Sequence, residues 1–141
     1  MALAANRNLK NKVSGRTAEY IVKSASVIYV GAIVAVEIAT GKLVVASDVA
    51  ATTATFAGIA RTSGTGNAGG TVTVVVERRG TFWLPHAGTA AQTDVGKLAC
   101  AVGDDTVNIA SATTNDMVVG KIVNVDIAGN LVEVDLEDRA A

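Results

Sequence analysis

The sequence predicts an all-β fold, a compact antiparallel β-barrel or sandwich, on three observations. Half of the 141 residues are hydrophobic, and most of those are alanine and valine. Branched side chains such as valine favour strands over helices. Short apolar runs follow one another, separated by turns that contain glycine, and no long segment has a helical periodicity. A chain of this length also suffices for one domain with a buried core.

The spacing of the apolar runs predicts about eight to ten short strands. They cover residues 20–23, 31–38, 42–46, 56–61, 71–77, 97–102, 106–109, 117–126 and 131–136. The turns at 39–41, 103–105 and 127–130 contain glycine and are expected to join neighbouring runs as hairpins. In the last run Val132, Val134 and Leu136 alternate with acidic residues, which is typical of a strand with one face in water.

Two connections separate these runs. The polar, glycine-rich residues 62–70 are predicted to form a loop. Residues 80–94 are predicted to link two halves of the body, and they contain the single tryptophan and the single proline of the chain.

Segments of the first half of the chain recur in the same order in the second half. The matched pairs are 30–36 with 95–102, 46–47 with 110–111, 56–60 with 118–122 and 72–77 with 132–137. Each second copy follows the first by 60 to 65 positions. This order predicts one β unit used twice, in residues 30–77 and 95–137, within a single domain of residues 19–141.

Residues 1–18 are predicted to form a flexible, extended N-terminal arm, because they show neither helical nor strand periodicity. Four positive charges precede the first acid of the chain, Glu19. They are Arg7, Lys10, Lys12 and Arg16. The arm is either a solvated tail or a segment that becomes ordered on a partner surface. The opposite end of the chain is acidic, so the two ends either pair between neighbouring subunits or stay separately solvated.

The residue inventory argues against an enzyme and against a cofactor or metal site. One histidine and one cysteine cannot build a structural zinc site. His86 has no nucleophile motif beside it and is expected in a loop or an interface, while Cys100 is expected to be a small buried apolar residue. The net charge of −1 argues against direct nucleic-acid binding, and no apolar run approaches the roughly 20 residues that span a bilayer.

The strongest candidate for a contact surface lies where the two units join. Arg78, Arg79, Phe82 and Trp83 place two cations beside two aromatic rings in a chain that has few aromatic residues. Arginine and tryptophan are enriched where interfaces carry their binding energy. The alternative is that Phe82 and Trp83 close one end of the β body, and both interpretations can hold together.

The order of these segments resembles the capsid decoration proteins of tailed bacteriophages, also called head-stabilising or cement proteins. The resemblance covers residues 18–137. It is carried by Val30-Gly31, Gly41-Lys42, Phe56-Ala57-Gly58-Ile59-Ala60, Gly80-Thr81-Phe82-Trp83-Leu84-Pro85, Val95-Gly96-Lys97-Leu98 and Gly120-Lys121-Ile122. The long basic arm is not part of the family pattern.

The resemblance implies a structural virion protein, made in the host cytoplasm, that binds the outer surface of the expanded capsid. Its partners would be the major capsid protein and other copies of itself, as a homo-trimer or a homo-dimer. A clamp of this kind needs no catalytic group and no cofactor. Its attachment becomes hard to reverse because many modest contacts act at the same time. The arm residues and the Arg78 to Trp83 surface would then contact the capsid or a neighbouring subunit.

Two other classes of function remain open at the level of sequence. One is another structural virion subunit, from a tail tube or a fibre base, which would assemble into rings or tubes by itself. The other is a β module that binds a ligand such as a glycan, although such sites usually present several aromatic residues on one face.

Overall fold

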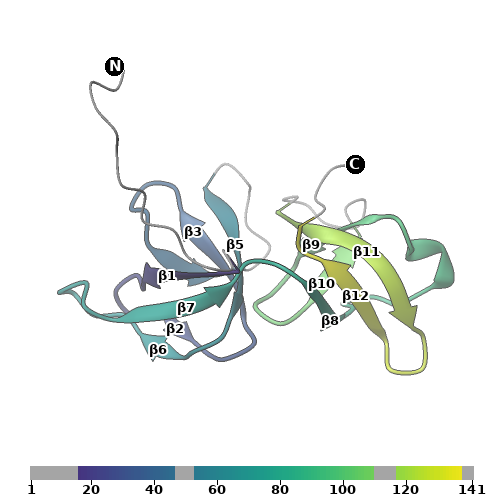
Figure 1. The fold of residues 1–141 in the computed structure, drawn as a ribbon, viewed down its shortest axis with the longest axis horizontal. Helices are drawn as coiled ribbons and strands as arrows, with labels where there is room; N and C mark the ends of the chain where they lie inside the picture. The colour runs from purple at the N-terminus through teal and green to yellow at the C-terminus, as the bar shows by residue number, and fades with distance from the viewer. Residues whose placement is uncertain (1–15, 47–52, 110–116, 138–141) are drawn as a thin grey trace, which may run out of the picture.

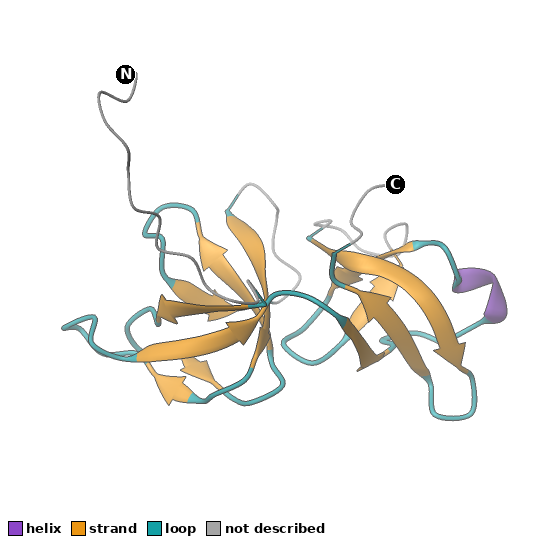
Figure 2. Cartoon of the chain, in the orientation of Figure 1, coloured by secondary structure: helices purple, strands orange, loops and turns teal. Residues whose placement is uncertain are grey.

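The computed structural model describes residues 16–46, 53–109 and 117–137. Within these residues the protein is all-β, as the sequence predicts, and two five-stranded antiparallel sheets form a sandwich (Figure 1; Figure 2). One short 3₁₀ turn, Gln92–Asp94, is added to the strands. The first sheet occupies the left half of Figure 1 and the second sheet the right half.

The first sheet has the strand order β1-β7-β5-β3-β4. Its strands are β1 (Thr17–Ile21), β3 (Ile33–Glu37), β4 (Leu43–Val45), β5 (Ala54–Ala60) and β7 (Thr73–Glu77). The second sheet has the order β10-β9-β11-β12-β8. Its strands are β8 (Thr81–Pro85), β9 (Leu98–Ala101), β10 (Val107–Ile109), β11 (Val118–Asp126) and β12 (Leu131–Asp135).

Two short strands pair beside the first sheet and correct one expectation. β2 (Val27–Ile28) pairs with β6 (Gly64–Thr65), so the run 62–70 is not a plain loop. Ile28 supplies the buried apolar side chain of this ribbon. Glycine allows close approach beside it, because the backbone of Gly66 leaves no room for a Cβ next to Lys23.

The two sheets have the same topology. β1, β7, β5, β3 and β4 correspond in order to β8, β12, β11, β9 and β10, so the second sheet repeats the first. The repeated unit is longer than the sequence indicates, because β1 and β8 occupy equivalent edges. Residues 81–85, expected to be part of a link, form the edge strand β8 instead.

Equivalent backbone hydrogen bonds support the correspondence. The N–H of Gly31 donates to the carbonyl of Ala60 at 2.8 Å, and the N–H of Gly96 donates to the carbonyl of Ile122 at 2.8 Å. Both glycines have a positive φ, 88° and 92°, which a residue with a side chain rarely adopts. The same turn therefore leads into β3 and into β9.

A bulge also recurs at one place in each sheet. The register of β5 with β3 shifts between Phe56 and Gly58, and that of β11 with β9 shifts between Val118 and Gly120. A Cβ on Gly58 would collide with the carbonyl oxygen of Glu77, and one on Gly120 with that of Asp135. Glycine at the bulge therefore lets the next strand approach closely in both units.

These contacts correct the sequence alignment of the last strand by two residues. Glu77 corresponds to Asp135 and not to Glu137, because the carbonyl oxygens of Glu77 and Asp135 lie against the two bulge glycines. The side-chain period of a strand is two, so a two-residue slip keeps every side chain on its face and leaves no trace in the pattern of apolar residues.

Two hydrophobic clusters form the core. The larger one joins the sheets, and its members include Ile33, Phe56 and Ile59 of the first sheet with Leu84, Val119, Ile122, Val132 and Val134 of the second. The smaller one is confined to the first unit and includes Val22, Ile28, Val34, Leu43, Val74 and Val76. The shared cluster fixes the position of one sheet relative to the other.

The boundary of the arm also changes. The expected arm of residues 1–18 overlaps the body, since β1 begins at Thr17 and the carbonyl of Arg16 accepts a hydrogen bond from the N–H of Arg78. The alternation of β1 is weak, with Glu19 exposed and Tyr20 half-buried, so the apolar pattern alone places its start too late.

Candidate interaction surface

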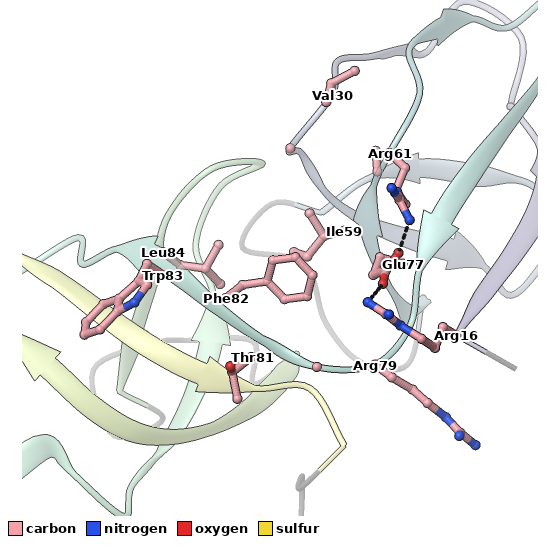
Figure 3. A pocket seen from close by; sticks show the side chains of 13 residues that line it. Arg16, Val30, Ile59, Arg61, Glu77, Arg79, Thr81, Phe82, Trp83 and Leu84 are labelled. Atoms are coloured by element: carbon pink, nitrogen blue, oxygen red, sulfur yellow. Dashed lines mark hydrogen bonds and ion pairs between the residues drawn. The ribbon is translucent and has the colours of Figure 1, made fainter. Parts of the chain in front are cut away.

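A groove of about 680 Å³ lies between the two sheets where the chain crosses from β7 to β8 (Figure 3). Arginine and apolar side chains line most of it. The lining residues are Arg16, Val30, Gly31, Ile59, Ala60, Arg61, Glu77, Arg79, Gly80, Thr81, Phe82, Trp83 and Leu84. The first sheet contributes one wall, and the consecutive residues 79–84 contribute the other.

A buried carboxylate holds two arginines in the groove. Glu77 ends β7, and its side chain is 5% exposed. One of its oxygens, Oε1, accepts from Nη2 of Arg16, and the other, Oε2, accepts from Nη1 of Arg61 at 3.0 Å (Figure 3). A buried carboxylate is costly unless it is paired, so the two guanidinium groups compensate it.

The two adjacent arginines of the crossover have different surroundings. Arg79 lines the groove and lies 3.7 Å from Glu137, with both side chains more than half exposed. Such exposed pairs contribute little and open easily. Arg78 is exposed and does not line the groove. The sequence-predicted arginine pair is therefore divided, and Arg79 alone belongs to this surface.

The two aromatic residues of β8 point to opposite faces of the strand. Phe82 is half-buried and packs against the core that joins the sheets, and in Figure 3 it points toward Ile59. Trp83 is 45% exposed. Phe82 thus closes the space between the sheets, which matches the interpretation that these aromatic residues close the β body. Trp83 presents its indole at the surface, which matches the interpretation that they form a contact surface.

The edge of β8 that borders the groove has no strand partner in the described part of the chain. The N–H of Leu136 donates to the carbonyl of Gly80, and the N–H of His86 donates to that of Asn130. In an antiparallel pair only every second residue forms main-chain hydrogen bonds with the partner strand. Since Gly80 and His86 form such bonds, the main-chain groups of Thr81 and Trp83 face away from β12. Pro85 has no N–H and ends this open edge.

Some of the predicted contact residues meet in the groove and some do not. The structure brings Arg16, Arg79, Phe82 and Trp83 to it, while Arg7, Lys10 and Lys12 lie outside the described residues. Sequence reasoning missed Arg61 and Glu77. In the sequence Glu77 alternates with valines, which is typical of a residue on the polar face of a strand. Its burial becomes understandable only in the structure, where Arg61 directly follows β5 and β5 pairs with β7.

A second cluster of polar side chains is buried at the far end of β8 and corrects the expectation for His86. Nδ1 of His86 accepts a hydrogen bond from the N–H of Gly88 at 2.8 Å, and its Nε2 lies 3.5 Å from Oδ2 of Asp94. Both side chains are buried. The equivalent residue of the first unit is Val22, because Val22 and His86 make matching bridges to Leu43 and Val107. His86 is therefore a core residue and not a loop histidine.

Among the described residues, no group of three or more histidine, cysteine, aspartate or glutamate side chains is arranged to hold a metal ion. Cys100 is fully buried, as expected. The described residues contain no helix that is long and apolar enough to cross a membrane.

No protein-family model matches the chain, and no curated protein matches it.

Proposed function

We propose that this protein is a structural component of a phage virion that binds the outer surface of the expanded capsid. There it stabilises contacts between neighbouring major capsid protein subunits, without catalysis and without a cofactor. Its partners are the major capsid protein and further copies of itself, in trimers or dimers. The resemblance of residues 18–137 to capsid decoration proteins supports this assignment.

One observation carries the proposal beyond the resemblance. The 80–85 segment, one of the stretches that carry the resemblance, contains the edge strand β8, with an open main-chain side, an exposed tryptophan and a groove that contains arginines. An open edge, an aromatic anchor and arginine are the features by which a rigid body attaches to another protein. They require no reactive group, which agrees with a cementing role.

The shape of the molecule also supports a clamp. Two sheets joined by a common core make a rigid body, and a rigid body transmits force between the subunits that it contacts. Copies at many equivalent lattice positions add modest contacts into an attachment that is hard to reverse.

Co-sedimentation with expanded, undecorated heads of the encoding phage tests the proposal, with electron microscopy of the protein alone beside it. We expect saturable binding at a fixed ratio to the major capsid protein, and no rings or tubes from the protein alone. Absence of binding together with self-assembly into tubes would assign the protein to a tail tube or fibre base. Absence of both would favour a ligand-binding β module.

A further inference from the structure

We infer that the groove between the sheets binds an extended, acidic segment of another polypeptide, which adds as a strand to the open edge of β8 (Figure 3). The inference concerns the chemistry of the groove and does not depend on the capsid assignment. It rests on the open main chain of β8, on the arginines along the groove, and on the way in which the groove already binds a carboxylate.

The first argument is the hydrogen-bonding capacity of β8. Residues 79–84 line the groove consecutively, from both faces of the strand, so the groove runs along the strand edge. The main-chain groups of Thr81 and Trp83 face this edge. The five residues of β8 extend about 17 Å, which is enough for a short peptide to add by main-chain hydrogen bonds.

The second argument is charge. Three arginines line the groove, and one carboxylate, Glu77, lies among them. Since the whole chain has a net charge of −1, this positive surface is a local feature and not the consequence of a basic protein. The side chains of Arg61 and Arg79 are 59% and 55% exposed, so both guanidinium groups can also meet further acids.

The third argument is that the groove already binds one carboxylate, that of Glu77, through two arginines. Arg16 and Arg61 each donate to one oxygen of Glu77, so the guanidinium groups are already placed around a carboxylate (Figure 3). Apolar side chains, including Val30 and Trp83, border the same space and are 66% and 45% exposed. A segment in which acidic and apolar side chains alternate matches both.

A nucleic acid fits the groove less well than a peptide. A strand edge offers alternating donors and acceptors that only another polypeptide backbone pairs in sequence. Nucleic acid is therefore the alternative that the test must distinguish.

Fluorescence of the full-length protein tests the inference, because the only tryptophan of the chain, Trp83, lines the groove. The probe is a synthetic six-residue peptide in which glutamate and valine alternate. We expect a saturable change with a dissociation constant below about 1 mM, and binding that weakens as salt is added. A matched peptide with lysine in place of glutamate should not bind. No saturable change, or equal binding of the lysine peptide, would overturn the inference.

Two adjacent residues supply a matched pair of variants. Arg79→Glu, which changes the groove, should weaken binding of the acidic peptide at least tenfold, whereas Arg78→Glu should leave it within about twofold. Both variants change the net charge of the protein equally. Equal losses of affinity for the acidic peptide would therefore mean that the groove itself does not attract the peptide. Far-ultraviolet circular dichroism checks that both remain folded.

Strand addition is tested by the peptide backbone. Two further peptides carry N-methyl groups on alternate residues, one set on the odd and one on the even positions. We expect one of them to lose binding and the other to retain it, because only alternate amides face β8. Equal affinity of both with the unmethylated peptide would contradict strand addition. Tighter binding of hexathymidylate than of the acidic peptide would reassign the groove to nucleic acid and overturn the inference.

Discussion

At the scale of single residues, two glycines determine how closely the strands of each unit approach. Gly58 and Gly120 lie against the carbonyl oxygens of Glu77 and Asp135, where a Cβ would also meet a valine side chain at 2.7 and 2.8 Å. The repetition of this contact in both units indicates that the close approach is a requirement of the repeated unit and not an accident of one strand.

Replacing either glycine by alanine is therefore expected to destabilise the protein. Gly58→Ala or Gly120→Ala should lower the free energy of unfolding by about 2 kcal/mol or more, since the backbone of the neighbouring strand must move. Gly69→Ala is the control, because its Cβ would lie 3.8 Å from Thr71 and should change stability by less than about 0.5 kcal/mol. Urea unfolding midpoints measure the difference, and equal midpoints for Gly58→Ala and Gly69→Ala would refute the collision.

A second residue-scale prediction concerns the pH dependence of Glu37. The hydrogen bond from Lys23, at 2.7 Å, and a further one from Thr40 lower the pKa of Glu37 below its ordinary value of 4.5. A carboxyl group whose pKa is lower in the folded than in the unfolded state stabilises the folded state at pH values above its unfolded pKa. This stabilisation is lost as the pH falls through the folded pKa.

Lys23→Met should therefore raise the pKa of Glu37 toward its ordinary value and remove the part of the stability that this carboxylate gains above pH 4.5. Carbon-detected NMR titration of the Glu37 carboxyl follows the shift directly. Lys42→Met serves as the control, since Lys42 is partly exposed and is not among the groups that lower this pKa. An unchanged titration in Lys23→Met would show that the ion pair does not form in solution.

At the scale of elements, β8 shows how far the sequence is informative. The alternation of 131–136 and the hairpin turns predict most strands within a few residues, because their apolar residues face a core. In β8 the burial alternates, with Phe82 and Leu84 on the inner face, but the exposed positions hold Trp83 and Pro85, so the residue types of Thr81–Pro85 show no alternation of polar and apolar side chains. It is a strand because it occupies the edge that β1 occupies in the first unit.

The groove was partly predictable for a related reason. Composition alone draws attention to Arg79, Phe82 and Trp83, since arginine beside aromatic residues is unusual in this chain. The roles of Arg61 and Glu77 depend on the pairing of β5 with β7, which brings their side chains together across 16 residues of sequence. A tertiary contact of this kind leaves no local pattern.

Trp83 of β8 carries the prediction for this element under the proposed function. Its side chain is 45% exposed, so Trp83→Ala should cost little stability while weakening attachment to heads or to other copies by about 1–3 kcal/mol. Ile127→Ala is the matched control, because Ile127 is 59% exposed, lies in the β11–β12 turn and does not line the groove. Co-sedimentation measures both variants, and a water-exposed Trp83 emission spectrum in both the free and the bound state would exclude the residue from the interface.

At the scale of the whole molecule, the arm and the body are expected to have separate roles. Deletion of residues 1–15 should weaken attachment to heads and leave the β body folded, because the described contacts of the body begin at Arg16. Deletion of residues 1–16 should in addition lower the unfolding midpoint, since Glu77 would lose one of its two guanidinium partners. Unchanged occupancy on heads after the shorter deletion would refute a role for the arm in attachment.

The shared core makes a further prediction for the molecule as a whole. A protein built from one unit used twice can unfold in two steps, one for each unit, or in one. Here Ile33, Phe56 and Ile59 of the first sheet belong to the same hydrophobic cluster as Leu84 and Val134 of the second, so opening either sheet exposes part of the other. Burial of apolar surface that both units share couples their stabilities, and we expect one cooperative transition.

The aromatic residues provide a separate probe for each unit. Both tyrosines, Tyr20 and Tyr29, belong to the first unit, and Trp83 belongs to the second. Urea unfolding followed by tyrosine absorbance and by tryptophan emission should give coincident curves. Phe56→Ala, which removes a core side chain of the first sheet, should shift the tryptophan curve as far as the tyrosine curve, by about 3 kcal/mol. If only the tyrosine curve moves, the two units are independent and the protein is a flexible pair of modules rather than a rigid body.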